Sequence, residues 1–264
     1  MSADAKLVRT IRGLLDRLVR SQRLSGDDQE VVYDEVAEAV ATLPRDGILE
    51  ALDRAVGSDK RRRKVSVVLL AHLTDVDEVV RRIGQSLHDP DPEWRHWLVQ
   101  TVDMRGLVQF AEPLNELILS EPAPFVRMAA VHAAGSLKSE VNLPALLSVA
   151  NDPPSDLRNT LLWALKDFAK ESCRPFLAEA FENAGSDKED RVVAAWGLAK
   201  LGDRAAAEYL AEMLEDPDVY HERGFEPGVS IRAAQALCSV YDWPFKWHKD
   251  SVEKTRKMWR NKDG

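Results

Sequence analysis

The sequence predicts an all-α protein built as a solenoid of about six to seven antiparallel helix pairs. The first observation is a series of arginines separated by 32, 32, 31, 33 and 41 residues, each early in an apolar segment with helical periodicity. The second is that each segment follows another apolar segment and a polar break rich in Asp and Pro. One helix pair cannot bury its apolar stripe alone, so this recurrence indicates stacked repeats. The arginines are Arg63, Arg95, Arg127, Arg158, Arg191 and Arg232.

Composition limits the classes of protein that the chain can belong to. Its 264 residues, 45% of them hydrophobic, suffice for a stable core. The 44 acidic residues outnumber the 36 basic ones, which disfavours a general nucleic-acid coat because phosphate polymers are repelled. We recognise no secretion signal and no run of about 18 apolar residues, so we expect a cytoplasmic protein that does not contact a membrane.

The two cysteines fit no metal-binding or redox spacing. Cys173 and Cys238 lie 65 residues apart and belong to no CxxC pattern. We expect buried free thiols of a reducing compartment, with a disulfide or a reactive thiol as the alternatives.

Residues 1–43 are expected to form an N-terminal capping helix pair. Residues 6–22 carry leucines and an isoleucine at helical spacing, and a second helix is expected to run from Ser25, its predicted N-cap, to about Leu43. Pro44 then ends or restarts the chain. This pair lacks the arginine of the later units, as terminal repeats often do.

Six repeats are expected over residues 44–242. The first helices are predicted at 45–56, 76–87, 111–120, 143–150, 174–184 and 203–215, and the second helices at 60–73, 93–105, 125–138, 156–169, 188–201 and 229–241. The fourth and seventh positions after each arginine are mostly apolar and predict the buried stripe of the second helix. Small residues beside this stripe, such as Gly135, would let neighbouring helices approach closely.

Residues 243–264 depart from the repeat pattern. Trp243, Phe245 and Trp247 surround Pro244, and a short helix is expected to follow to about Trp259. We expect an aromatic plug that caps the last repeat, because so many aromatic side chains are costly to leave in water. A free recognition tail is the alternative. The three parts together are expected to form a single solenoid domain.

The breaks and the arginines that follow them resemble HEAT repeats. The segments "DPDPEWR", "EPAPFVR" and "DPPSDLR", which end at Arg95, Arg127 and Arg158, are similar to the turn and second-helix start of that family, and the short units are similar to its PBS-lyase-like subgroup. The resemblance covers about residues 44–242. It implies a right-handed superhelix whose second helices line a concave face. It also implies that turn aspartates and second-helix arginines link successive repeats.

A candidate binding ridge follows from the helical phase. If the fourth and seventh positions are buried, then the first, fifth and eighth positions face largely the other way. Tryptophan on such a face is a common binding anchor. A phase error of one residue would instead place the tryptophans in the core between repeats. The predicted ridge residues are His96, Gln100, Asp103, His132, Asn159, Trp163, Lys166 and Trp196.

Two further segments have binding potential. An insertion at 216–228 is richer in aromatic and charged residues than a spacer needs, although a neutral surface loop is the alternative. Its candidate binding residues are Tyr220, His221, Arg223 and Phe225. The basic run at 59–64 can meet an acidic partner or phosphate through Arg61, Arg62 and Lys64, or it can be a solvated helix face.

The common signatures of enzymes are missing, with one weak exception. The sequence holds no P-loop, HExxH motif or serine elbow, and its six histidines are not paired at metal spacing. The segments "LRNTLLWALKDFAKESCRPF" and "WRHWLVQTVD" are weakly similar to the HEAT-like alkylpurine DNA glycosylases. That resemblance implies Asp103 as the catalytic residue and Trp97 and Trp163 as contacts to DNA, but a net charge of −8 opposes a DNA-binding groove.

We therefore expect a non-catalytic, monomeric HEAT-repeat scaffold with no cofactor and no metal. It is expected to bind a protein or peptide partner through its concave face, in an immunity-like or regulatory role. The alternatives are the glycosylase and a bilin-lyase-like tetrapyrrole chaperone, which rests on the similarity to the PBS-lyase-like repeats alone.

Overall fold

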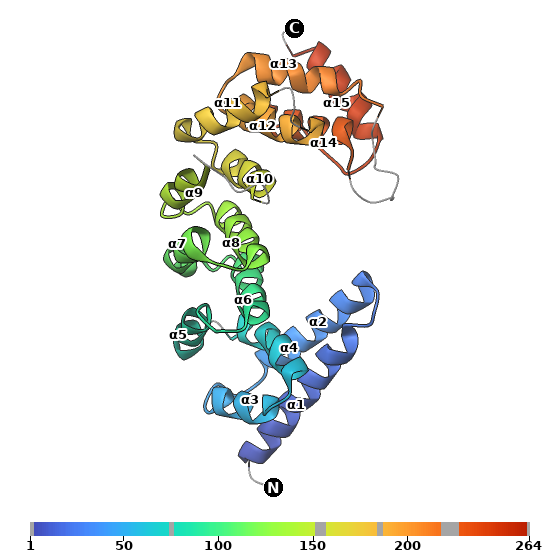
Figure 1. Cartoon of the computed structure of the whole chain (residues 1–264). Helices are drawn as coiled ribbons and strands as arrows, with labels where there is room; N and C mark the ends of the chain where they lie inside the picture. The colour runs from blue at the N-terminus through green and yellow to red at the C-terminus, as the bar shows by residue number, and fades with distance from the viewer. Residues whose placement is uncertain (1–2, 74–76, 151–156, 184–186, 218–226, 263–264) are drawn as a thin grey trace. The chain divides into compact units, whose positions relative to one another are not determined.

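The computed structural model describes residues 3–73, 77–150, 157–183, 187–217 and 227–262. Every regular element in these ranges is helical, with fifteen α-helices and two short 3-10 helices and no strand (Figure 1). The prediction of an all-α fold made of helix pairs is confirmed. The chain divides into two compact units, the first holding residues up to 117 with 121–129 and the second holding residues 118–120 with those from 130 onward.

The first unit contains the N-terminal pair and the first repeats. Its predicted helix bounds agree with the structure to within about three residues. Gly47 adopts φ 68°, in the left-handed region, so the helix that follows it begins later than predicted. The helices are α1 (Ala3–Ser21), α2 (Gly26–Ala41), α3 (Ile48–Val56), α4 (Lys60–Ala71), α5 (Asp77–Ser86), α6 (Pro92–Met104), the 3-10 helix η1 (Val108–Phe110) and α7 (Ala111–Ser120).

The second unit contains the remaining repeats and the C-terminal helix. The helix α8 (Pro124–Leu137) contributes its first residues to the first unit and its last residues to the second. The other helices are α9 (Leu143–Ala150), α10 (Arg158–Phe168), the 3-10 helix η2 (Glu171–Cys173), α11 (Arg174–Glu182), α12 (Lys188–Lys200), α13 (Arg204–Met213), α14 (Val229–Tyr241) and α15 (Asp250–Arg260).

Aspartates in the breaks cap several second helices. The Asp91 carboxylate accepts a hydrogen bond from the Glu93 amide at 3.0 Å, which satisfies an orphan donor at the start of α6. Equivalent bonds to backbone amides are made at the starts of the second helices α4 and α12 by Asp59 and Asp187, and Asp203 caps the first helix α13 in the same way. Ser25, the predicted cap of α2, makes no such bond, because its hydroxyl bonds the Asp28 carboxylate at 2.8 Å instead.

The predicted buried stripe holds in both units. At the fourth and seventh positions after Arg95, Val99 and Val102 are fully buried, and the equivalent Leu162 and Leu165 on α10 are fully buried as well. In the first unit, α1 packs against α3 and α4, and α4 packs against α6. This stack places the second helices side by side, with the stripe between them and the first helices.

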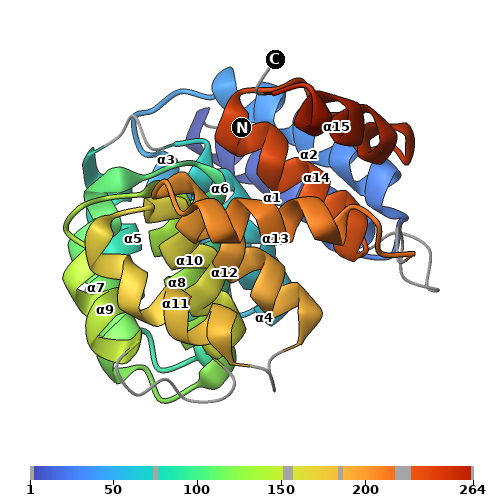
Figure 2. The ribbon, with the colours of Figure 1, turned by 90° about the horizontal axis from the view of Figure 1, so that it is seen from above.

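Small residues bring second helices close together in the second unit. A Cβ atom placed on Gly135 of α8 would lie 2.6 Å from the Ala164 Cα of α10, so the two backbones pass nearer than any larger residue allows. The helix α12 lies among α10, α11, α13 and α14, and Figures 1 and 2 show α11 and α13 beside it. Every side chain from Val192 to Ala199 of this helix is buried as a result.

The arginine series links neighbouring helices, as the resemblance implied. Arg95 Nε and Nη2 donate to the Glu121 carboxylate at 2.9 and 2.5 Å, and this ion pair is almost completely buried. Arg63 pairs with Asp89 at 2.5 Å, and Arg158 pairs with Glu179 at 3.2 Å. Most partners differ from the expected turn aspartate. Through these bonds the arginines connect neighbouring helices of the solenoid.

The C-terminal plug prediction is wrong for Trp247. This side chain is 56% exposed and packs edge-on against Phe245 at 5.1 Å. Trp243 stacks on Tyr241 at the end of α14, and helix α15 also covers α14, with Cys238 Sγ 3.3 Å from the buried Thr255 hydroxyl. Both cysteines are buried free thiols, and burial raises the pKa of each. The single-domain organisation and the hand of the superhelix stay predictions.

Candidate binding site

Three predicted ridge residues meet in the second unit. The rings of Trp163 on α10 and Trp196 on α12 pack edge-on, with centroids 6.2 Å apart and planes at 78°. Lys166, one turn after Trp163, places its Nζ 4.5 Å from the Trp163 centroid and 3.9 Å from the Trp196 centroid. A cation at such distances is attracted by the negative faces of both rings. We call this group the tryptophan–lysine cluster.

Burial separates the members of the tryptophan–lysine cluster. Trp163 is half-buried, whereas Trp196 and Lys166 are only 5% and 4% exposed. The predicted exposure of Trp196 and Lys166 is therefore wrong. The helical phase is not the cause: α12 is surrounded by neighbouring helices and has no open face. Trp196 Nε1 is buried without a hydrogen-bond partner among the described residues.

Two lysines and a carboxylate lie close together at the cluster. Lys166 Nζ pairs with the Asp167 carboxylate at 3.0 Å, and Lys200 Nζ lies 3.8 Å from the same group. Burial lowers the pKa of Lys166, and the nearby Asp167 only partly opposes this effect. Lys200 also approaches the Trp196 ring, at 5.4 Å. One carboxylate therefore lies close to two ammonium groups, that of the buried Lys166 and that of the half-buried Lys200.

Further polar contacts lie over and beside Trp163. Arg232 of α14 places its guanidinium carbon 5.0 Å from the Trp163 centroid and pairs with Glu189 at 3.2 Å. Asn159, which is exposed one turn before Trp163, donates to the Asp190 carboxylate at 2.7 Å. Trp163 thus has a fixed orientation while part of its ring reaches the surface. His132, exposed on α8, occupies the equivalent position to Trp163 on the neighbouring second helix.

The remaining ridge residues lie in the first unit. His96, Gln100 and Asp103 are all half-buried on α6. The His96 ring packs edge-on against Phe125 with centroids 5.4 Å apart, and burial lowers the pKa of His96. His96 Nδ1 has no hydrogen-bond partner among the described residues. These contacts give His96 a packing role within the first unit.

Residues of the predicted insertion site cannot be placed. Tyr220, His221, Arg223 and Phe225 lie outside the described residues.

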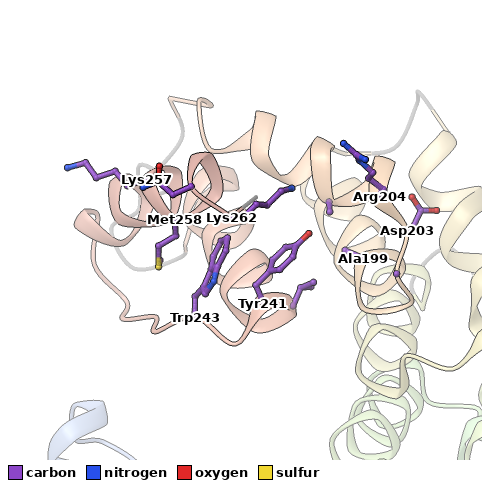
Figure 3. A pocket seen from close by; sticks show the side chains of 12 residues that line it. Ala199, Asp203, Arg204, Tyr241, Trp243, Lys257, Met258 and Lys262 are labelled. Carbon is purple, nitrogen blue, oxygen red and sulfur yellow. The ribbon is translucent and has the colours of Figure 1, made fainter. Parts of the chain in front are cut away.

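A pocket that the sequence did not predict lies at the C-terminal end of the second unit. It has a volume of about 850 Å³ and is bounded by the end of α12, the start of α13 and the helices α14 and α15. Figure 3 shows Tyr241 and Trp243 projecting into it side by side, with Lys262 beside them and Arg204 opposite. The two rings stack with centroids 4.9 Å apart. The dense aromatic residues after α14 are the available signal in the sequence, but their pattern predicts a plug and not a pocket.

Metal and membrane features are not found in the described part of the chain. No three His, Cys, Asp or Glu side chains gather there into a possible metal site. None of its helices is both long and apolar enough to cross a bilayer.

The fold and the cluster define a helical-repeat protein with a fixed aromatic group on its second helices. A family model for HEAT repeats matches residues 80–166 and 143–224, which together span more than half of the chain. The chain belongs to the HEAT-repeat family.

Three solved structures are similar to the chain, and the first of them supports the helical-repeat fold. The YibA protein of Escherichia coli matches with 18% identity and a TM-score of 0.54 over 97% of each chain. An engineered protein matches with 17% identity and a TM-score of 0.46, over 92% of this chain and 71% of that one. Human deoxyhypusine hydroxylase in complex with glycerol matches with 14% identity and a TM-score of 0.32, over 90% and 96%. No curated protein matches the sequence significantly.

Proposed function

We propose that the chain is a non-catalytic HEAT-repeat scaffold that binds a protein or peptide partner through the face of its second helices. The observation that carries this proposal is the fixed, partly exposed ring of Trp163. Trp196 makes a T-shaped contact with this ring, and the cationic groups of Lys166 and Arg232 lie over it, 4.5 and 5.0 Å from its centroid. An aromatic side chain that is already immobile loses little conformational entropy on binding, so it supplies affinity efficiently.

The residues beside Trp163 suit a protein surface better than a chemical reaction. Asn159 and His132 are exposed on the second helices α10 and α8, where their polar groups can contact a partner protein. Asp167, the carboxylate nearest to the cluster, is paired with Lys166 at 3.0 Å, so it is not poised as a general base. Positioning without a reactive group is what a binding scaffold requires.

The test is affinity purification with the immobilised full chain, its Trp163→Ala variant and a Trp247→Ala control, from an extract of the source cells. The control removes the same side chain from a more exposed position in the second unit. A central anchor contributes about 2 kcal/mol or more, so we expect recovery of the partner to fall about thirtyfold with Trp163→Ala and to be unchanged with Trp247→Ala. Equal recovery by all three proteins, each folded by circular dichroism, would reject the proposal.

Trp196→Ala is unsuitable as a binding variant. Removing a tryptophan that is 5% exposed is expected to destabilise the second unit by about 3–5 kcal/mol, so any loss of binding would have two explanations.

A further inference from the structure

A second pocket, in the first unit, joins the N-terminal helix pair to the second helices α4 and α6. It has a volume of about 450 Å³, within the usual range for ligand sites. Most of its wall is apolar or aromatic. That part of the wall consists of Val19, Tyr33, Val65, Val67, Val68 and Trp97.

Every charged side chain that lines this pocket is a cation. These are Arg20, Arg23, Arg61 and Lys64, in a protein whose net charge is −8. Lys64 pairs with Glu93, but among the described residues the guanidinium groups of Arg20, Arg23 and Arg61 have no carboxylate partner. By contrast, seven other arginines of the first unit pair with a carboxylate. The pocket is therefore locally positive although the protein as a whole is negatively charged.

Arg61 lies at a position that is unfavourable for its positive charge. It lies in the first turn of α4, where the helix dipole disfavours a positive charge. The capping carboxylate of Asp59 offsets the dipole by accepting the Arg61 and Arg62 amides at 2.9 and 3.1 Å, and the guanidinium of Arg61 stays exposed. An anionic ligand in the pocket would give this charge a partner.

We propose that the pocket binds an acidic peptide segment of a partner protein. An apolar or aromatic side chain of the segment enters between Val19, Val68 and Trp97, and carboxylates on either side of it pair with Arg20, Arg23 and Arg61. This site lies in the first unit and goes beyond the proposed role of Trp163.

A peptide fits this wall better than a nucleic acid does. Single-stranded nucleic acids need exposed aromatic faces on which bases stack, whereas here four valines make up most of the apolar wall. The Tyr33 hydroxyl, the polar group of the second aromatic residue, already accepts hydrogen bonds from Gln22 and Gln29 at 2.9 and 3.2 Å. A valine-lined pocket with a cationic rim matches an apolar side chain flanked by carboxylates.

The test starts from a displayed library of random dodecapeptides selected on the purified full chain. We expect the selected peptides to carry one aromatic or large aliphatic residue flanked by Asp or Glu. The best one is then synthesised with a fluorescent label, and its affinity is measured by anisotropy for the wild type and for an Arg20→Gln, Arg61→Gln double variant. The matched control is Arg9→Gln, Arg81→Gln, which removes two exposed arginines of the same unit outside the pocket.

Each exposed ion pair contributes a factor of roughly 1.4 to 5 to affinity, so we expect binding to weaken about two- to thirtyfold in the pocket variant. The control should bind like the wild type, and so should Trp163→Ala, because the two proposed sites are independent.

Selected peptides without acidic residues would overturn the proposal, as would equal affinities for the pocket variant and its control. A dodecamer of deoxythymidine that displaces the peptide and depends on the same two arginines would overturn it in favour of nucleic acid.

Discussion

Replacing Gly135 by alanine tests the close packing of adjacent second helices. The new Cβ atom would lie 2.6 Å from the Ala164 Cα and 2.8 Å from the Ala164 Cβ, whereas carbon atoms in contact are ordinarily 3.5–4.0 Å apart. Backbone atoms cannot rotate away, so α8 and α10 would have to separate by about 1 Å. Such overpacking costs about 1–3 kcal/mol.

Alanine also has a higher helix propensity than glycine, by about 1 kcal/mol, and this gain must be subtracted. Gly13→Ala is the matched control, because Gly13 lies inside α1 and its added Cβ would meet nothing within 4 Å. We expect Gly13→Ala to stabilise the protein by about 0.5–1 kcal/mol, and the propensity gain cancels when the two variants are compared. The expected difference between them is therefore the clash itself, about 1–3 kcal/mol.

The assay is urea unfolding followed by far-ultraviolet circular dichroism, with thermal unfolding as a second measure. A difference of 1 kcal/mol corresponds to about 2–4 °C in Tm for a chain of this size. If Gly135→Ala were as stable as Gly13→Ala, the reasoning that small residues permit a close approach of these helices would be refuted.

Two more predictions concern buried charges. Burial lowers the pKa of Lys166, so the folded state binds fewer protons than the unfolded state as pH rises towards the ordinary lysine value of about 10.4. The free energy of unfolding should therefore rise with pH in this window. Lys166→Met should reduce that rise when urea midpoints at pH 7 and 9.5 are compared. An unchanged slope would contradict this. Glu121→Gln leaves the nearly buried Arg95 guanidinium without its counter-charge, so it should lower the free energy of unfolding by about 3–5 kcal/mol, measured by thermal unfolding. The control Glu112→Gln changes an exposed residue and should cost under about 0.5 kcal/mol. Similar losses of stability in both variants would contradict the role of this ion pair.

The Glu121 carboxyl also predicts a response to acid. Burial would raise the pKa of Glu121, but hydrogen bonds from Arg95 and from the Ala123 amide outweigh burial and hold the pKa below its ordinary value. The stability that this lowered pKa contributes is present above the ordinary glutamate pKa and is lost as pH falls through the folded value. Glu121→Gln should therefore flatten the loss of stability in acid, measured by thermal unfolding between pH 7 and 3.

Local periodicity was sufficient to predict the helices, whereas the linking role of the arginines was implied by the resemblance to HEAT repeats. Each helix depends on spacing that is visible within about 15 residues, and each arginine recurs at the repeat interval. The stripe at Val99, Val102, Leu162 and Leu165 followed from the same periodicity and is buried as predicted. Phase relative to the arginines also brought Trp163, Lys166 and Trp196 into one group.

Exposure within that group could not be predicted from phase. Trp196 and Trp163 occupy the same position after their arginines, yet α12 is covered by neighbours on all sides while α10 leaves part of Trp163 open. The pocket in the first unit was hidden for a related reason, because it joins residues 19–33 to residues 61–68 and Trp97. The N-terminal pair lies outside the repeat register, so no alignment on the arginines brings these residues together.

Photo-crosslinking from chosen positions tests the central claim most directly. The crosslinker p-benzoylphenylalanine is placed either at Asn159, exposed beside Trp163 on a second helix, or at Glu182, exposed at the end of the first helix α11. With the partner recovered by affinity purification, we predict a crosslink from position 159 and none from position 182. A crosslink from position 182 alone would contradict binding through the second helices.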